Sequence, residues 1–392
     1  MLGWLSSSVY TKPFLLLTLV SFLTFGILNV YNLLPLYIHA LGGREAEIGR
    51  IMALYHVAAI LCQAATAGLL DRWPRRPVLL VGTIALTVAS LAFALTTRLS
   101  WHFYLLRFLQ GVGLALSSTV GLALIGELAP PGRRAEAVGL YGVSGLAAIA
   151  LAPAIGEVVL HAWGFPALFL STALLGVGAV MVCATIPLPA EIPHLERVAP
   201  TRRVWLSLLP VLQPAFQFGL ANTILFVFLP PFGQQIGLHR VGVFYLVYTA
   251  AAIAVRVGGG RLADRLGRRQ IILPALVGQT LGLVLCIGLQ STTVLVLVGL
   301  LNGTAQGFLF PATSALAFEL APSGRRTGIL AIFSMAVLLG GVVGATGFGW
   351  AAEVLGYRPS FGLASALLGL GTLIFWWNSR AATPFPGRPS AA

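Results

Sequence analysis

Residues 127–134 read Glu-Leu-Ala-Pro-Pro-Gly-Arg-Arg, and residues 319–326 read Glu-Leu-Ala-Pro-Ser-Gly-Arg-Arg, at an offset of 319 − 127 = 192. A second pair lies upstream of these, where Asp71-Arg72-Trp73-Pro74-Arg75-Arg76 corresponds to Asp264-Arg265-Leu266-Gly267-Arg268-Arg269 at an offset of 264 − 71 = 193. Both pairs sit where long apolar segments end. The sequence therefore predicts two copies of one structural unit.

The composition indicates that lipid is the solvent of both copies. Hydrophobic residues make up 58% of the 392 residues, charged residues make up only 9%, and the mean hydropathy is +0.92. A soluble domain of this size could not hide so much apolar surface from water. The apolar residues form long runs and do not alternate in ten-residue strands, so we expect helices and not a membrane barrel.

Eleven polar breaks divide the chain into twelve predicted membrane-spanning helices, each near the 20 residues needed to cross a bilayer. The longest break, around residues 188–205, predicts a linker between a six-helix bundle at 1–187 and a second one at 206–380, and residues 381–392 are expected to be disordered. The first apolar stretch runs from Pro13 to about residue 40, which is too long for a cleavable signal peptide. The other breaks fall at 42–50, 71–77, 96–102, 130–134, 161–165, 237–241, 261–270, 290–293, 322–326 and 356–359.

The basic residues predict the orientation. Seventeen lie on the side that carries both ends of the chain and five lie on the other side, while Arg107 and Arg256 fall inside spans. Because positive residues concentrate on the cytoplasmic side, both termini are expected in the cytoplasm, in a bacterial-type inner membrane. The five are Arg44, Arg50, Arg98, Arg240 and Arg358.

The repeat continues inside the membrane. Gly26-x-x-Asn29 corresponds to Gly219-x-x-Asn222, and Leu109-Gln110-Gly111 corresponds to Leu301-Asn302-Gly303. Six spans in each copy give both copies the same orientation, so the axis that relates them should run along the membrane normal.

Several classes of function receive no support from the residues. The net charge of +13 is explained by topology, since no clustered basic and aromatic face suggests nucleic acid. Cys62, Cys183 and Cys286 all lie in apolar segments, without the spacing of a disulfide framework or a zinc site. Gly258-Gly259-Gly260 is followed by no Lys-Ser or Lys-Thr pair, so it is not a phosphate loop. We therefore expect no metal and no cofactor.

The loop Gly260-Arg261-Leu262-Ala263-Asp264-Arg265-Leu266-Gly267-Arg268-Arg269 resembles the signature loop of the major facilitator superfamily. The first copy departs from it, with Ala67 and Pro74 in place of the two glycines. The resemblance implies a cytoplasmic gate in which carboxylates at helix ends pair with arginines of neighbouring helices. A solvated positive loop is the alternative. The gate residues it implies are Asp71, Arg72, Arg75, Arg76, Glu127, Arg256, Asp264, Arg265, Arg268 and Glu319, with Asp264, Glu319 and either Arg256 or Arg265 forming one cluster.

Two further segments resemble motifs of the same superfamily. Arg107 opens a run ending at Ala115 that is similar to the motif of the fourth span, and an Arg in hydrocarbon is costly enough to mark a pathway or a partner. A structural hydrogen bond to backbone is the other reading of Arg107. Gly139, Pro153 and Gly156 resemble the antiporter motif of exporters, although Ala148, Ala152 and Glu157 replace glycines of it. Generic helix packing would explain the same small residues.

In this family spans 1, 4, 7 and 10 line a central cavity. By that resemblance the candidate substrate residues are amides and one arginine, with Tyr31, Phe218 and Phe226 as apolar surface. Uncharged amides beside one Arg suit a neutral or weakly anionic amphiphile, whereas hydrogen bonds between helices are the alternative role for the amides. The candidates are Asn29, Asn32, Arg107, Gln110, Gln217, Asn222, Asn302 and Gln306.

Proton coupling has fewer candidates. All eleven acidic residues fall at or near span ends or in loops. Arg107 and Glu157 are the residues we single out for coupling. His56 is a lone histidine on an apolar helix, and we expect it to pack or to form a hydrogen bond without a role in coupling.

These observations predict a secondary transporter, not an enzyme, which exports a drug-like molecule or metabolite by alternating access with proton antiport. Uptake of a sugar or other metabolite is the alternative, and an intramembrane enzyme or sensor is a distant one, since the spans contain no catalytic constellation. The expected partners are a small-molecule substrate, protons and membrane lipid, with no nucleic acid, and the chain is expected to act as a monomer.

Overall fold

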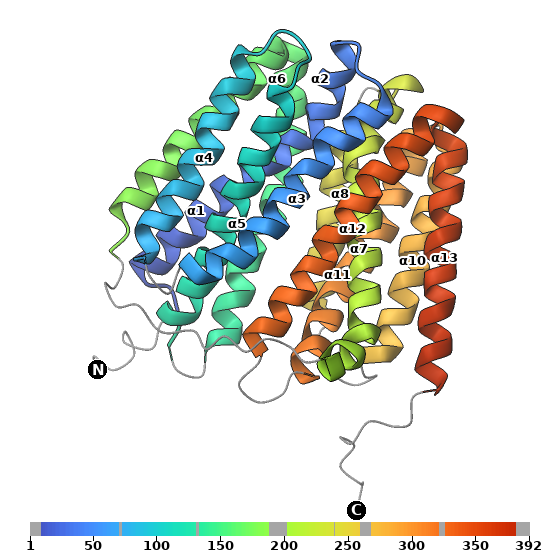
Figure 1. The fold of residues 1–392 in the computed structure, drawn as a ribbon. Coiled ribbons are helices and arrows are strands. Elements are labelled where there is room, and N and C mark those ends of the chain that lie inside the picture. The colour runs from blue at the N-terminus through green and yellow to red at the C-terminus, as the bar shows by residue number, and fades with distance from the viewer. Residues whose placement is uncertain are drawn as a thin grey trace, which may run out of the picture.

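The computed structural model describes residues 9–69, 73–130, 133–187, 202–238, 240–258, 268–320 and 326–381, and in these ranges the regular structure is entirely helical (Figure 1). The predicted linker and tail fall mainly outside these ranges. The helices are α1 (Lys12–Val30), η2 (Tyr31–Leu33), α2 (Leu34–Ala40), α3 (Glu45–Leu69), α4 (Arg75–Leu95), α5 (His102–Leu128), α6 (Arg134–Thr185), α7 (Arg202–Gln235), α8 (Gly242–Gly258), α10 (Arg268–Ile287), α11 (Thr292–Glu319), α12 (Arg326–Leu355) and α13 (Tyr357–Ala381).

These helices make twelve crossings of the bundle, as predicted. The elements α1, η2 and α2 form one crossing, interrupted by a 3₁₀ turn next to Pro35. The long α6 makes two crossings, because Gly164 adopts φ 79° and bends the chain back where the sequence predicted a break. Only glycine adopts that conformation without strain, so the hairpin follows directly from the residue type.

Length and composition agree with a membrane location. Among the described residues, nine helical segments are long and apolar enough to cross a bilayer, and one of them, 136–185, contains two crossings. The remaining two are the 17-residue apolar α8 and α3, which carries Glu45, Glu47 and Arg50 in its first two turns. Large apolar side chains such as Trp377 and Val158 are exposed on the outside of the bundle, as expected for contact with lipid.

The helices form two bundles that meet along two pairs of helices. Helices α1 to α6 pack mainly on one another, and α7 to α13 do the same. Between the bundles, α3 packs on α12 and α6 packs on α8, with a smaller contact of α2 on α7. The start of α1 and the end of α13 lie at one end of the bundles, which we call the termini face, and the connection between α2 and α3 lies at the other end, the opposite face (Figure 1).

One pair of repeat-related glycines allows close helix contacts inside each bundle. A Cβ on Gly111 of α5 or on Gly303 of α11 would approach the carbonyl oxygen of Tyr55 or Tyr248, respectively, to well under 3.0 Å. The two contacts occupy the same place in the two copies. At this pair of positions the duplicated sequence therefore encodes the same packing twice.

Candidate functional site

A cavity of about 240 Å³ lies between the two bundles. The first bundle contributes residues of α1, α3, α5 and α6, and the second contributes residues of α7 and α12. The lining is mostly aromatic and aliphatic with a few polar groups, which is typical of a small-molecule site. The lining residues are Phe25, Leu28, Asn29, Asn32, Met52, Tyr55, His56, Arg107, Ile149, Phe218, Gly219, Asn222, Thr223, Phe226, Val227, Val337 and Leu338.

Arg107 supplies the positive charge of this cavity. Its side chain is 3% exposed, and its Nη1 donates a hydrogen bond of 2.7 Å to Oε1 of Gln110. The guanidinium carbon lies 4.7 Å from the ring centroid of Tyr55 and 5.9 Å from that of Tyr31. Within the described residues Arg107 Nε has no hydrogen-bond partner, and no carboxylate lines the cavity.

This arrangement leaves a buried cation only partly compensated. Ring faces and one amide oxygen stabilise a guanidinium, yet they carry no negative charge. A buried charge is costly unless it is paired, so an anionic group entering the cavity would gain from Arg107. The hydrogen bond of Arg107 thus goes to a side chain and not to backbone in the described residues, and its role in transport stays a prediction.

Three of the predicted amides line the cavity. Asn29 Nδ2 donates to the carbonyl of Phe25 at 2.8 Å, and Asn32 Nδ2 donates to Asn29 Oδ1 at 3.3 Å. Across the cavity, Asn222 Oδ1 accepts from the hydroxyl of Tyr248 at 2.8 Å. The repeat-related Asn29 and Asn222 therefore line the cavity from opposite sides, on the equivalent helices α1 and α7.

The other four predicted cavity residues lie elsewhere. Gln110 lies fully buried behind Arg107, and Gln217 donates to the carbonyl of Leu368 on α13 at 2.8 Å. Asn302 bonds within its own helix and fills the space beside Gly282 of α10, while Gln306 is buried in α11. For Gln217 the structure shows a hydrogen bond between helices, whereas Asn302 contacts α10 by packing and not by a hydrogen bond.

The expectation about the lining helices needs correction. No described residue of α11, the tenth span, lines the cavity, whereas α3, α6 and α12 do. The sequence-based prediction therefore missed Tyr55 and His56 of α3 as lining residues. The His56 ring is held within its own helix, where Nδ1 lies 3.3 Å from the carbonyl oxygen of Met52. Helices that are apolar on every side carry no periodic signal for their inward face, so the sequence offered little to find them with.

Ion pairs at the termini face join helices within one bundle. Arg75 Nε donates to both carboxylate oxygens of Glu127 at 2.8 and 3.0 Å, and Arg75 is 4% exposed. The repeat-related Arg268 donates to Glu319 at 2.6 Å, with both partners more exposed. The predicted pairing of these glutamates with arginines of neighbouring helices is present, and it links α4 to α5 and α10 to α11.

Of the remaining gate candidates, the two that the structure describes do not join these pairs. Arg76 is exposed, and Arg256 lies 5.9 Å from the ring centroid of Phe310. Asp71, Arg72, Asp264 and Arg265 fall outside the described residues. Of the cluster predicted around Asp264, the structure therefore describes Glu319, which pairs with Arg268, and Arg256, which lies beside Phe310.

Glu157 lies at the opposite face and contacts the other bundle. Its two carboxylate oxygens accept hydrogen bonds of 2.8 Å from the backbone N–H groups of Val241 and Gly242, at the start of α8. Of the antiporter-like residues, Pro153 is buried in α6, and Gly156 fits against Leu33 and Leu168. Among the described residues, and leaving aside the neighbouring backbone of its own helix, no atom lies within 4 Å of a Cβ placed on Gly139.

Two bundles of six crossings around a central cavity are typical of secondary transporters. The profile of the Major Facilitator Superfamily matches residues 14–259 and 215–392. The chain belongs to the major facilitator superfamily, and it is a multi-pass membrane protein and a secondary transporter, not an enzyme.

Individual proteins that resemble this chain share a low sequence identity with it. The chain is 24% identical over 350 residues to the multi-drug resistance efflux pump PmrA of Streptococcus pneumoniae, covering 85% of this chain and 87% of that one. It is 28% identical over 376 residues to monocarboxylate transporter 13 of Rattus norvegicus, covering 90% and 86%. Among solved structures, a bacterial homologue of the lysosomal transporter Spinster superposes with a TM-score of 0.78 at 15% identity, over 94% of this chain and 98% of that one.

Proposed function

We propose that this transporter exports small organic molecules that are neutral or weakly anionic, in exchange for protons. The single observation that carries the substrate class is Arg107, a buried cation at the wall of the central cavity with no carboxylate beside it in the described lining. A strong cation would meet like charge there and would lack a counter-ion, which disfavours it by electrostatics alone.

The apolar lining supports an amphiphilic substrate. Phe25, Phe218 and Phe226 provide ring surface, and Asn29 and Asn222 provide hydrogen bonds without charge. Sites of this kind bind through buried apolar area and use a few polar groups for orientation. The resemblance to an efflux pump and the span-five pattern around Pro153 and Gly156 support export as the direction.

A second candidate is uptake of an organic monocarboxylate. The same guanidinium would pair with a carboxylate, and one relative of nearly full length is named a monocarboxylate transporter. Arg107 fits both candidates, so the direction of transport is what separates them.

The charge distribution supports one orientation in the membrane. We propose that both termini lie in the cytoplasm, because seventeen of the basic residues fall on the termini side and five on the other. We also propose that the protein acts as a monomer, because one chain supplies both bundles, and that it lies in a bacterial inner membrane, which the likeness to a bacterial efflux pump supports. Arg107 and Glu157 are the residues proposed for proton coupling.

The experiment uses everted membrane vesicles that contain the protein and three fluorescent probes of matched size, one anionic, one neutral and one cationic. Proton-driven export predicts that energised vesicles accumulate the neutral and anionic probes, and that a protonophore abolishes the accumulation. Preferred accumulation of the cationic probe would contradict the substrate class. Uptake of the anionic probe into right-side-out vesicles instead would select the monocarboxylate candidate.

Arg107→Gln tests directly whether the charge of Arg107 selects the substrate. It should reduce anion transport at least tenfold, since one charged hydrogen bond contributes about 1.5–3 kcal/mol, and should leave the neutral probe less affected. Gln306→Leu, which changes a buried polar residue outside the cavity lining, is the matched control.

A further inference from the structure

Two carboxylates at the opposite face join the two bundles in the same way. Glu157 reaches from α6 of the first bundle to the first turn of α8 in the second. Glu353 reaches from α12 of the second bundle to the first turn of α3 in the first. We propose that Glu157 and Glu353 are a matched pair of latches that hold the opposite face closed and so set the balance between the two states of the transporter.

The Glu157 latch is bidentate. Oε1 accepts from Val241 N and Oε2 accepts from Gly242 N, each at 2.8 Å. Free N–H groups at a helix start carry partial positive charge, so a carboxylate there gains both hydrogen bonds and a favourable field. Among the described residues, the other titratable or charged groups around this contact are His161 and Arg240, which line the groove beside it, and the Tyr245 phenol of α8.

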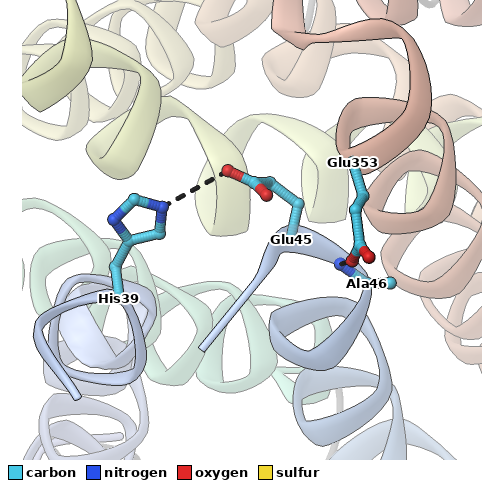
Figure 2. Close-up of polar contacts among 4 residues, drawn as sticks. All are labelled: His39, Glu45, Ala46 and Glu353. Atoms are coloured by element: carbon cyan, nitrogen blue, oxygen red, sulfur yellow. Dashed lines mark hydrogen bonds and ion pairs between the residues drawn. The ribbon is translucent and has the colours of Figure 1, made fainter. Parts of the chain in front are cut away.

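Figure 2 shows the Glu353 latch. Glu353 Oε2 accepts from the backbone N–H of Ala46 at 3.0 Å, one residue into α3. The neighbouring Glu45 points the other way, toward His39 at 3.3 Å, within its own bundle. Arg44 lies 3.8 Å from Glu353 but is 80% exposed, so solvent screens that pair and the backbone contact carries the interaction.

The two latches join helices that are related by the duplication, although the two glutamates do not stand at equivalent positions of the repeat. Glu353 follows Glu157 by 353 − 157 = 196 residues, which is the repeat offset of 192 plus about one helical turn. The helices they join, α6 with α8 and α12 with α3, are the two large contacts between the bundles. The bundles touch closely beside each latch, since Gly242 lies against Ala154, and Gly49 lies against Ala345 and Gly349.

Opening of the opposite face must break both latches. Each one spans the boundary along which the bundles separate, whereas the ion pairs Arg75–Glu127 and Arg268–Glu319 lie inside single bundles and survive a rigid-body movement. A substitution that weakens a latch destabilises only the state in which the opposite face is closed. It should therefore shift the population toward the state that is open there.

The size of the shift follows from the weakened hydrogen bonds. Replacing either glutamate by Gln removes the charge that strengthens its hydrogen bonds to backbone N–H groups, and at Glu157 it also puts an amide N–H₂, which cannot accept, in place of one of the two accepting oxygens. Each change should shift the ratio of the two states about tenfold. The latches share no partner, so Glu157→Gln/Glu353→Gln should shift it by roughly a hundredfold. Asp keeps the charge, so Glu157→Asp and Glu353→Asp should lie closer to the parent protein.

The test measures distances across both faces of the whole protein by electron–electron double resonance. Spin labels are placed, after replacement of the three native cysteines by Ser, at Arg98→Cys with Gln290→Cys on the opposite face and at Trp73→Cys with Asn378→Cys on the termini face. All four sites are exposed. The inference predicts longer distances at the opposite face and shorter distances at the termini face in the Gln variants, in the order single, then double.

The two-sided readout separates a latch from a merely structural residue. Local damage would broaden distances without the opposite change at the other face, and this result would overturn the inference. The matched control is Glu136→Gln, which removes a carboxylate paired with Arg133 inside one bundle and should move neither distribution. Because no substrate is needed, the result stands whether the transporter exports or imports.

Discussion

Gly49→Ala should act on the conformation of the transporter and not on its folding. Gly49 of α3 lies at the boundary between the bundles, where an added Cβ would come well within 3.0 Å of the Ala345 carbonyl oxygen and 3.3 Å from the Cα of Gly349. Both neighbours are backbone of α12 and cannot rotate away. To restore an ordinary contact of 3.4 Å, the helices must separate by more than 3.4 − 3.0 = 0.4 Å.

The helices can separate at a low cost in free energy only because Gly49 contacts the other bundle, which can move as a whole. Overpacking of a tight interface costs about 1–3 kcal/mol, and the bundles can relieve it by rocking apart at the opposite face. The ratio of the two states should therefore shift by about 5- to 150-fold toward the state open at that face. Gly303→Ala creates a similar clash with the Tyr248 carbonyl inside one bundle, where no rocking relieves it, so it should lower the free energy of unfolding by a comparable amount.

The assay compares three alanine variants by thermal unfolding in detergent and by the two pairs of spin labels defined above. Gly139→Ala is the matched control, because no atom lies within 4 Å of its new Cβ. We expect Gly49→Ala to change the distances with a nearly unchanged Tm, Gly303→Ala to lower the Tm with unchanged distances, and Gly139→Ala to do neither. The reasoning is refuted if Gly49→Ala lowers the Tm as Gly303→Ala does and leaves both distances unchanged.

Three further outcomes are expected. Glu127→Gln should destabilise the protein by about 1–3 kcal/mol in chemical unfolding and more than Glu319→Gln does, because Arg75 is 4% exposed and would lose its counter-ion in a buried site; equal effects would contradict the role of burial. Arg107→Gln should reduce transport of an anionic probe at least tenfold relative to a neutral probe of the same size in vesicle assays, and an equal loss of both would show that the guanidinium is structural. Gly164→Ala should cost on the order of 1 kcal/mol in thermal unfolding, since φ 79° strains a residue with a Cβ, and a neutral result would argue against that strain.

Much of the fold is determined by local chemistry and was therefore predictable. The duplicated Glu-Leu-Ala-Pro segments, the twelve apolar stretches and the break near Gly164 each depend on a few neighbouring residues, and the structure confirms the two-bundle fold that they indicate. The resemblance also implied the pairing of Glu127 and Glu319 with arginines that follow the second and eighth spans, and the structure shows the pairs Arg75–Glu127 and Arg268–Glu319. The export direction, the proton coupling and the site roles stay predictions.

The tertiary structure alone decided which polar residues face the cavity. Asn222 and Asn302 are both amides in apolar helices, yet Asn222 lines the cavity, and Asn302 fills the space beside Gly282. Likewise, Glu157 and Glu353 are carboxylates near span ends in the sequence, and only the packing of α6 on α8 and of α12 on α3 brings them to backbone N–H groups of the other bundle. The physical reason is that hydropathy depends only on the composition of a segment, whereas the direction of a side chain depends on how each helix is rotated against its neighbours. A helix surrounded by lipid and protein has no polar face, so its sequence carries no signal of that rotation.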